Sequence, residues 1–258
     1  NPVHQYLSSS DLVLAIGTSL GYRLTAGVGL RLPKNLVHIN LDSATFHKNY
    51  SCSVALEGDA KIIMQQLIAA INGRDFTKGA SALREINQLK QHVYHALVEQ
   101  GPNQQRTMET LRSIIPRQAI VVFDSTIPAY WGMRGFDVYE PRTFMAPHGW
   151  GSIGFGFPAA IGAKAACPGM PVVVITGDGG FQYNMAELAT AIQEKLDVII
   201  LLFNDEAYGV LKARQETYHN RHFIGTNLLN PDFVRWAEAY NVFSIRTHTL
   251  AELARALE

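Results

Sequence analysis

The sequence predicts an α/β fold with a mainly parallel sheet, and residues 172–210 carry most of that prediction. Two short apolar runs, 172–176 and 198–203, flank a segment with helical periodicity. A strand, helix and strand in succession join parallel strands through a right-handed crossover. Each apolar run is followed by an acidic, turn-forming sequence, 177–180 and 204–209. Both turns are therefore expected at the carboxyl edge of the sheet, where open α/β sheets bind ligands.

The first 72 residues predict three further strands and a closing helix. The strands are the apolar runs 11–17, 36–41 and 54–58. Asp59 is the predicted N-cap of a helix that extends to Ala70. Three strands and one helix in this length resemble half of a small Rossmann-like domain.

A polar, glycine-containing stretch at 73–81 is the predicted linker between two domains. We therefore expect a partial central Rossmann-like domain over 1–72 and a larger domain over 82–258. The predicted elements of the larger domain are helices at 82–98 and 107–115, a strand at 119–123, a helix from within 154–158 to about 166, the strand–helix–strand unit at 172–203, a helix from within 230–233 to 239, a strand at 242–245 and a helix at 250–257.

Composition excludes several classes of function. The chain has 258 residues, of which 47% are hydrophobic and 17% charged, and this fits a globular protein with a sizeable core. Its formal net charge is +0, so nothing favours binding to nucleic acid or to an anionic membrane. No apolar run is long enough to cross a membrane. Cys52 and Cys167 lack metal-type spacing and are expected to be free thiols of a cytoplasmic protein.

The two acidic turns predict a metal-bridged diphosphate site. Asp178 and Asp205 come to the same sheet edge, and both offer oxygen to a small hard cation. Mg²⁺ takes about six oxygens, usually from one or two carboxylates, phosphates and water. The glycines around Asp178 let backbone N–H groups approach a phosphate, and a helix N-terminus follows directly. The alternative is a purely structural unit, because Asp and Gly are common turn residues.

The sequence Gly-Asp-Gly at 177–179, followed after 24 residues by an Asn-led turn, resembles the binding signature of thiamine-diphosphate enzymes. The resemblance implies that Asp178, Asp205 and the backbone carbonyl of Ala207 hold the metal. Asp205 replaces the Asn that is usual at its position, which keeps an oxygen ligand and adds negative charge. The cofactor-binding residues implied in the two turns are Gly177, Asp178, Gly179, Gly180, Asp205, Ala207, Tyr208 and Gly209.

A second motif points to the same family. Residues 150–155 (WGSIGF) and 158–163 (PAAIGA) closely resemble the segment that clamps the aminopyrimidine of thiamine diphosphate. By that resemblance Gly151, Ser152 and Ile153 contact the cofactor, and the carbonyl of Gly151 accepts from its 4′-amino group. The backbone N–H of Ile153 meets the pyrimidine, and its side chain bends the cofactor so that the amino group approaches the reactive carbon. An ordinary core aliphatic is the alternative for Ile153.

The glycines at 149, 151 and 154 also spell Gly-x-Gly-x-x-Gly, which taken alone is a dinucleotide fingerprint. Two observations oppose an NAD-type site. Residues 142–145 make a poor core strand for the strand–turn–helix entry that such a site needs. Asp178 is embedded in a glycine turn of its own, which a ribose-binding acid does not need.

Three further polar residues are candidates for the site. Ser125 and Thr126 follow the strand at 119–123, and in the resembled family the loop at this position contacts the diphosphate. The alternative is a turn in which these hydroxyls satisfy their own backbone. His148 lies at the mouth of the glycine turn and is a candidate to protonate or hydrogen-bond a substrate. A surface histidine without a catalytic role is the alternative.

Two segments relate the chain to the acetolactate synthases, whose central domain carries FAD. Their FAD-binding segment aligns with residues 17–25, where Arg23 and Thr25 are kept and Ser19 replaces the first Arg. Because one of the two arginines is replaced, FAD is only a candidate second cofactor. Arg214 stands where these synthases have a Trp that selects the second 2-keto acid, so the resemblance does not name the substrate.

The resemblance covers essentially the whole chain. It implies a doubly wound, mainly parallel α/β domain for diphosphate binding, preceded by the partial central domain. The implied function is that of the C-terminal part of an enzyme that uses thiamine diphosphate and Mg²⁺ to decarboxylate or ligate 2-keto acids. The alternatives are an NAD-type oxidoreductase and a non-catalytic assembly module with the same fold.

The resemblance also implies a partner. The family activates the cofactor with a Glu on a separate pyrimidine-binding domain, usually from another subunit. Glu187, Glu194 and Glu206 lie on or beside the diphosphate motif and do not fit that role. We therefore expect a fragment or a split-enzyme subunit that is inactive alone. We also expect a homodimer or homotetramer with the cofactor at the subunit interface.

Overall fold

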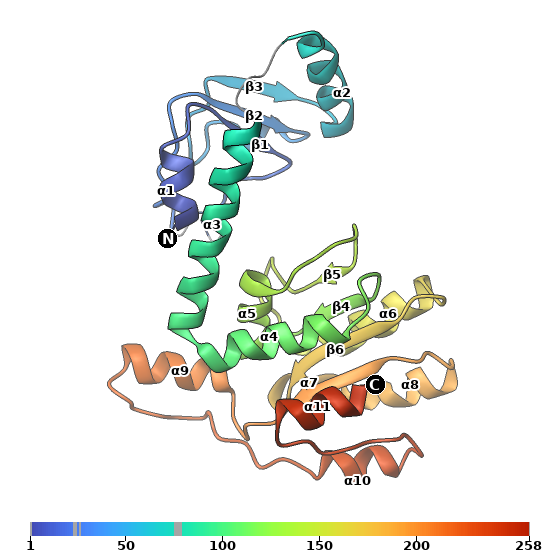
Figure 1. Cartoon of the computed structure of the whole chain (residues 1–258). Coiled ribbons are helices and arrows are strands. Elements are labelled where there is room, and N and C mark those ends of the chain that lie inside the picture. The colour runs from blue at the N-terminus through green and yellow to red at the C-terminus, as the bar shows by residue number, and fades with distance from the viewer. Residues whose placement is uncertain (1, 23–24, 26, 75–78, 258) are drawn as a thin grey trace. The chain divides into compact units, whose positions relative to one another are not determined.

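A computed structural model of the chain describes residues 2–22, 25, 27–74 and 79–257 (Figure 1). By internal contacts the chain divides into an N-terminal unit, Asn1–Ala96, and a C-terminal unit, Leu97–Glu258. Each unit has its own parallel sheet. Within the described ranges, no helix is long and apolar enough to cross a membrane.

The N-terminal unit is built on the three-stranded sheet β1-β2-β3, and all its strands are parallel. The helix α2 follows Asp59, whose side chain accepts from the backbone N–H of Ile62 at 3.1 Å, as the predicted N-cap requires. The elements of this unit are α1 (Pro2–Ser8), β1 (Val13–Ile16), β2 (Leu36–Asn40), η1 (Ser43–Thr45), β3 (Val54–Glu57), α2 (Ala60–Ile71) and most of α3 (Gly79–Gln100). The three predicted strands and the predicted helix are confirmed, whereas α1 was not predicted.

The last residues of the predicted linker belong to a helix. Residues 79–81 already belong to α3, which continues past the division between the two units at Ala96. Residues 75–78 lie outside the described ranges. The boundary at 73–81 therefore stays a prediction.

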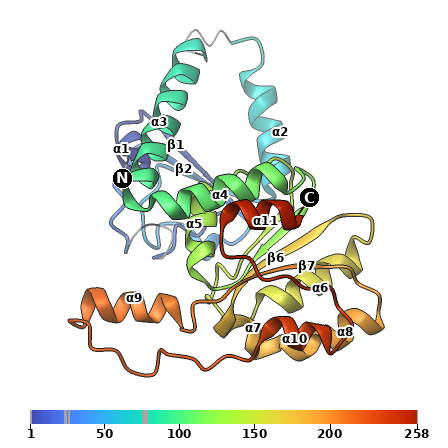
Figure 2. The ribbon, with the colours of Figure 1, turned by 60° about the horizontal axis from the view of Figure 1, so that its bottom comes forward.

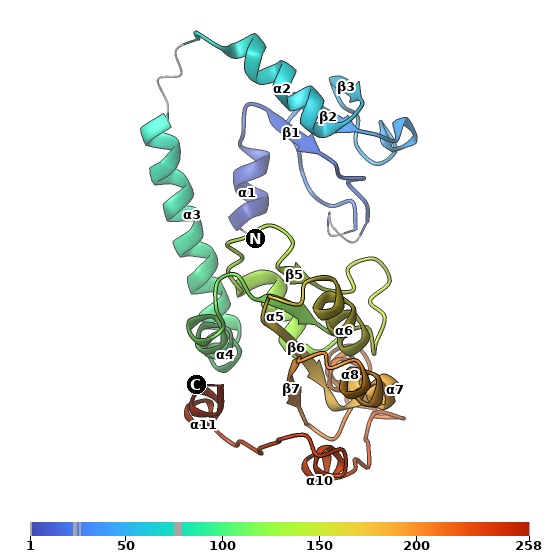
Figure 3. The same cartoon turned by 90° about the vertical axis from the view of Figure 1, so that its right-hand side faces the viewer.

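The C-terminal unit has the four-stranded parallel sheet β5-β4-β6-β7 with helices on both faces. Figure 3 shows α4 and α11 on one side of the sheet and α6, α7 and α8 on the other, and Figure 2 shows α11 beside α4. Helix α10 packs on α7, where the rings of Phe233 and Trp236 contact Phe181. The elements of this unit are α4 (Pro102–Ile114), β4 (Ile120–Phe123), α5 (Ile127–Gly135), β5 (Phe144–Met145), α6 (Gly156–Ala166), β6 (Val172–Gly177), α7 (Asp178–Asn184), η2 (Met185–Glu187), α8 (Leu188–Gln193), β7 (Ile199–Phe203), α9 (Gly209–Tyr218), α10 (Phe233–Glu238) and α11 (Leu250–Leu257). The doubly wound α/β prediction is confirmed.

Both faces of the central strands are packed, because successive residues of a strand point to opposite sides. Val121 and Phe123 of β4 join the cluster beneath α4, α5 and α11. Ile120 and Val122 join the cluster beneath α6, α7 and α8. Every residue of β4 and β6 is buried. This explains why both strands have continuous apolar sequences rather than alternating ones.

The sheet order places a switch point between β4 and β6. The chain leaves β4 through α5 toward β5 on one side, and leaves β6 through α7 and α8 toward β7 on the other. A crevice forms at the carboxyl ends of two such neighbouring strands. Asp124 and Asp178 directly follow β4 and the apolar part of β6 at this place.

Three predictions of local structure were wrong or incomplete. Residues 242–245 form no strand: Phe243 and Ile245 are exposed, and the hydroxyl of Ser244 donates to the carbonyl of Val234. The turn predicted at 177–180 is instead the last residue of β6 followed by the first turn of α7. The helices α5 and α9 were not predicted.

Candidate cofactor site

Asp178 lies at the switch point with almost no exposure to solvent. It is the first residue of α7 and is 1% exposed. The amide Nδ2 of Asn230 donates to Asp178 Oδ2 at 2.6 Å. A carboxylate so buried needs such partners, because an unpaired buried charge is strongly destabilising.

Asp205 brings a second carboxylate to Asp178. Partial desolvation, followed by the negative charge of Asp178 and a hydrogen bond between the two side chains, raises the pKa of Asp205 above its ordinary value. The backbone N–H of Ala207 opposes this shift by donating to the Asp205 carboxylate. When both carboxyl groups are ionised they repel each other, and a cation between them would remove that repulsion.

Asn230 is a site residue that the sequence analysis missed. Its Nδ2 contacts both Asp178 Oδ2 and Asn204 Oδ1 at 2.6 Å, and its Oδ1 accepts from Gln182 at 2.9 Å. The amide thus connects the start of α7, the turn after β7 and the segment before α10. The only local pattern around Asn230 is that Pro231 and Asp232 follow it, and Asp232 is the N-cap of α10. That pattern marks a helix start and carries no information about a distant carboxylate.

The donor set fits a hard cation shared with a phosphate. Asp178 and Asp205 offer carboxylate oxygens, which Mg²⁺ prefers. Within the described ranges, no group of three or more His, Cys, Asp or Glu side chains is placed to hold a metal. A cation between the two aspartates would therefore complete its shell with backbone carbonyl, water and phosphate oxygens, as Mg²⁺ commonly does.

The turn after β7 is held by an antiparallel pairing with residues 226–228. Ala207 bridges Asn227, Tyr208 N donates to Thr226 O at 2.8 Å, and Leu228 N donates to Glu206 O at 2.8 Å. Ala207 is buried as a result. This pairing fixes the backbone of the residues expected to contact the metal and the diphosphate.

The glycines of the two turns are needed for close packing between protein segments. A Cβ on Gly179 would lie 2.7 Å from the ring of Tyr208, and one on Gly177 would lie 2.8 Å from Thr126 Oγ1. A Cβ on Gly209 would overlap Asp205 Oδ2. The sequence analysis gave these glycines one role, access for a phosphate, and the structure adds a second.

The predicted pyrimidine-binding turn is an open loop attached to α7. Gly151 and Gly154 have φ of +67° and +83°, a region that favours glycine. The carbonyl of Gly154 accepts from Asn184 Nδ2 at 2.8 Å. Ser152 and Ile153 are exposed, and Ile153 Cγ1 lies 3.5 Å from the Cβ position of Gly180. Ile153 therefore stands at the rim of the site and is not an ordinary core aliphatic.

The loop after β4 reaches the same place. Thr126 is the N-cap of α5, but its side chain makes no capping hydrogen bond, and its hydroxyl faces Gly177. Ser125 is half-buried, and its backbone N–H donates to Asp124. The hydroxyl of Thr126 is thus not used to cap its own helix. The predicted contact of Ser125 and Thr126 with a diphosphate stays a prediction.

His148 is exposed and stacks on Phe144, with ring centroids 6.1 Å apart and planes at 29°. Nothing in this geometry tests its predicted role toward a substrate. For FAD, Arg23 lies outside the described residues. Thr25 is buried, and its hydroxyl donates to the carbonyl of Gly21. FAD binding therefore also stays a prediction.

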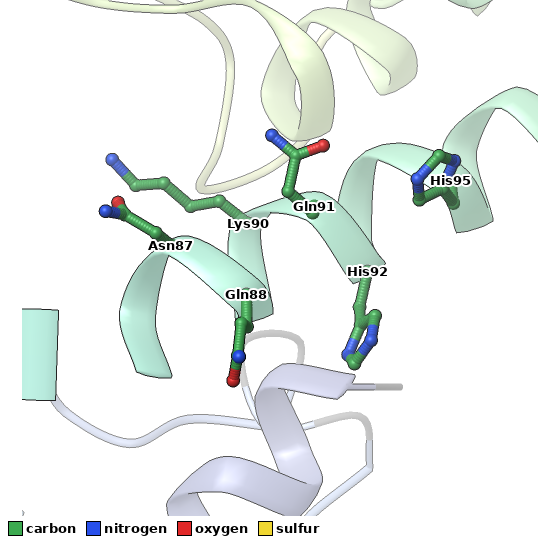
Figure 4. Close-up of a pocket in the computed structure, with 6 residues that line it drawn as sticks. All are labelled: Asn87, Gln88, Lys90, Gln91, His92 and His95. Carbon is green, nitrogen blue, oxygen red and sulfur yellow. The ribbon is translucent and has the colours of Figure 1, made fainter. Parts of the chain in front are cut away.

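A hollow along α3 is separate from these residues. Figure 4 shows its six lining side chains on this one helix: Asn87, Gln88, Lys90, Gln91, His92 and His95. None of them belongs to the residues predicted to contact metal or cofactor.

Comparison with known proteins agrees with this site. Residues 124–258 match the family described as "Thiamine pyrophosphate enzyme, C-terminal TPP binding domain". Residues 1–67 match "Thiamine pyrophosphate enzyme, central domain". The chain therefore belongs to the thiamine pyrophosphate enzyme family. Within it, residues 124–258 are the region that corresponds to the cofactor-binding domain.

Three individual relatives are similar to this chain over nearly its whole length. The chain is 29% identical to a "Probable acetolactate synthase large subunit" of Methanococcus aeolicus over 100% of its length, which is 46% of that protein. It is 31% identical to the protein of the same name in Methanocaldococcus jannaschii, over 98% of the chain and 44% of the relative. It is 32% identical to a "Probable 2-ketoarginine decarboxylase" of Pseudomonas aeruginosa, over 99% of the chain and 46% of the relative. The chain thus spans about half the length of these relatives.

Proposed function

We propose that this chain binds thiamine diphosphate through Mg²⁺ and forms the cofactor-binding part of an enzyme acting on 2-keto acids. The observation that carries the proposal is the pair Asp178 and Asp205, which lie together at the carboxyl ends of the neighbouring strands β6 and β7. Two adjacent carboxylates, with no third His, Cys, Asp or Glu side chain placed beside them in the described ranges, suit a cation that also binds a diphosphate.

Each part of the site has one task in this proposal. Asp178, Asp205 and the carbonyl of Ala207 hold Mg²⁺. Ser125 and Thr126 contact the diphosphate, since the Thr126 hydroxyl faces the start of α7 and caps nothing. The remaining diphosphate contacts are Gly177, Gly179, Gly180, Tyr208 and Gly209.

The turn at 151–153 serves the other end of the cofactor. Gly151, Ser152 and Ile153 contact the aminopyrimidine, and the exposed position of Ile153 leaves its side chain free to support the bent cofactor. When bound, thiamine diphosphate supplies a nucleophilic carbon and an electron sink for bond changes beside a keto group. His148 is proposed to hydrogen-bond the substrate at the mouth of this turn.

The relatives suggest the reaction class. Two carry the name of an acetolactate synthase and one that of a 2-ketoarginine decarboxylase. We propose a 2-keto acid as substrate, with decarboxylation or carboligation as the reaction. The activating Glu is proposed to come from a pyrimidine-binding domain of a partner subunit in a cytoplasmic homodimer or homotetramer. The chain alone is then inactive, and decarboxylation of 2-keto acids by the purified chain would contradict this point.

Titration calorimetry tests the cofactor site. We expect thiamine diphosphate to bind in Mg²⁺ and not in EDTA, and Asp178→Ala to abolish binding. The control is Asp197→Ala, an exposed aspartate at the amino end of β7. A chain that does not bind should be titrated again with a pyrimidine-binding domain attached. No measurable binding by the chain alone or by the chain with the added domain would contradict the proposal. Tighter binding of NADH than of thiamine diphosphate would also contradict it.

A further inference from the structure

A second aspartate at the switch point has no place in the proposed metal site. Asp124 directly follows β4, and its side chain is completely buried. Its Oδ1 accepts from the backbone N–H of Ser125 at 2.6 Å and from that of Gly154 at 3.0 Å. Its Oδ2 accepts from the hydroxyl of Thr176 at 3.1 Å. Three donors on one carboxylate compensate for the loss of water around a buried charge.

The surrounding sequence leaves room for this carboxylate. A Cβ on Gly180 would lie 2.8 Å from Asp124 Oδ2, and a Cβ on Gly156 would lie 2.8 Å from Asp124 Cβ. Both distances are too short for real side chains. Gly180 belongs to the acidic turn 177–180 at the diphosphate end, and Gly156 lies between the two segments, 150–155 and 158–163, of the pyrimidine motif. Both motifs are thus fitted around Asp124.

The three donors belong to three different walls of the proposed site. Ser125 begins the loop that reaches the diphosphate. Thr176 precedes Gly177 and Asp178, which belong to the metal end. Gly154 ends the turn that carries Gly151 and Ile153, the proposed pyrimidine contacts. One carboxylate therefore connects the diphosphate end of the site to the pyrimidine end.

Most of the pyrimidine turn is exposed to solvent. His148, Gly149, Trp150, Ser152 and Ile153 are all exposed, so few apolar contacts fix this loop. Among the described contacts of Gly154, its N–H binds Asp124 and its carbonyl accepts from Asn184. The Asp124 bond ties Gly154, at the end of this turn, to the residue that directly follows β4.

We propose that Asp124 is a positioning residue that sets the spacing between the pyrimidine turn and the diphosphate end of the cofactor site. It acts through the N–H of Gly154 and touches neither cofactor nor metal. This inference rests on the proposed function, because the spacing matters only for a ligand that spans both ends.

The test compares a ligand that spans the site with one that occupies only its diphosphate end. Thiamine diphosphate and inorganic diphosphate, each with Mg²⁺, are titrated into the native chain and three variants, well below the unfolding temperature of the least stable one. Asp124→Ala removes the acceptor for Gly154. Asp124→Asn keeps Oδ1 for both N–H groups, and its Nδ2 can donate to the Thr176 hydroxyl. Thr176→Val removes one donor and leaves the turn attached.

In Asp124→Ala we expect thiamine diphosphate to bind about tenfold more weakly, while inorganic diphosphate changes by less than about threefold. In Asp124→Asn and Thr176→Val both ligands should stay within about threefold of the native values, although Thr176→Val also loses thermal stability. The ratio of the two affinities is the decisive readout, since a general loss of stability changes both ligands alike.

Several outcomes would overturn the inference. One is an Asp124→Ala protein that melts earlier yet binds thiamine diphosphate as the native chain does. Another is equal weakening of both ligands. If Asp124→Ala does not fold, an Asp124→Asn protein with a changed affinity ratio would overturn it, and an unchanged ratio supports it. Failure of the native chain to bind thiamine diphosphate is a different result, which counts against the proposed function itself.

Discussion

The carboxyl ends of β4 and β6 carry similar residues in different surroundings. Asp124 and Asp178 each follow a run of buried strand residues, and each is itself almost completely buried. Asp124 accepts hydrogen bonds from two backbone N–H groups and a hydroxyl. Asp178 instead faces the carboxylate of Asp205 and the amide of Asn230.

The difference shows what decides the role of a buried aspartate. The carboxylate of Asp124 is already compensated, because three donors take up most of its roughly four lone-pair sites. A carboxylate beside another carboxylate remains under repulsion, which a cation removes. The strand sequence predicts where both aspartates lie, but the groups that face them come from distant segments.

The largest effect is expected for Asp178→Asn. Loss of a proposed direct ligand should weaken Mg²⁺-dependent binding of thiamine diphosphate by about 100-fold or more, since even outer partners of metal ligands contribute about 10–100-fold. The same exchange at Asp124 should change it by less than about threefold. Calorimetry at several Mg²⁺ concentrations measures both. Equal losses in the two variants would erase the distinction between the two strand ends.

Asn230→Ala should have the next largest effect. The Asn230 amide orients Asp178 Oδ2, so its removal should weaken Mg²⁺ affinity by about tenfold without abolishing binding. The control is Asn227→Ala, because Asn227 is exposed on the same segment and its side chain accepts from Lys212. Titration with Mn²⁺, followed by its paramagnetic resonance signal, measures the affinity. Equal affinities in the two variants would contradict a role for Asn230.

Two helical glycines should respond in opposite directions to substitution by alanine. Gly180→Ala should destabilise the protein by about 1 kcal/mol, because its Cβ meets Asp124 Oδ2 at 2.8 Å and the clash outweighs the gain in helix propensity. Gly162→Ala in α6 should stabilise it by about 0.5–1 kcal/mol, since no atom lies within 4 Å of its Cβ position. Urea unfolding of both variants checks the signs. Stabilisation by Gly180→Ala would show that Asp124 has room to move.

The smallest effect concerns the pH dependence set by Asp205. Its pKa is raised in the folded protein, so the folded state holds this proton to a higher pH than the unfolded state does. In EDTA, stability should fall as pH rises from the ordinary carboxyl range to the raised pKa, and stay lower above it. Asp205→Asn should lessen that fall, and Mg²⁺ should reverse it at neutral pH. The measurement is the thermal unfolding midpoint of the native chain and of Asp205→Asn as a function of pH. Parallel profiles for the two chains would contradict this account.

The sequence predicted much of the fold because its strands carry a strong local signal. The runs at 119–123 and 172–175 are apolar throughout, and strands packed on both faces require that pattern. The run at 242–245 is also mostly apolar but lies in no sheet, since strand formation depends on a neighbour and not on composition alone. Helix α9 was missed because its sequence, GVLKARQETY, shows no clear apolar face.

Site residues were predictable only where the local sequence pattern fixes their place in the fold. Asp178 and Asp205 stand at strand ends, so the topology alone brings them to the same edge. Asn230 reaches Asp178 from 52 residues away, and no local pattern predicts that contact. Asp124 has the same local pattern as Asp178, an acid after a buried strand. The sequence analysis selected the neighbouring hydroxyls of Ser125 and Thr126 and did not include this carboxylate.

Trp150 gives the protein a built-in optical probe. It is 94% exposed, one residue before Gly151, whereas Trp131 and Trp236 are partly buried and packed against the two core clusters. Among the three tryptophans of the chain, its indole should emit at the longest wavelength, because water relaxes around its excited state. Red-edge emission therefore reports on this one loop. Quenching by iodide, before and after a ligand is added, should follow the occupancy of the neighbouring turn in real time and without a label.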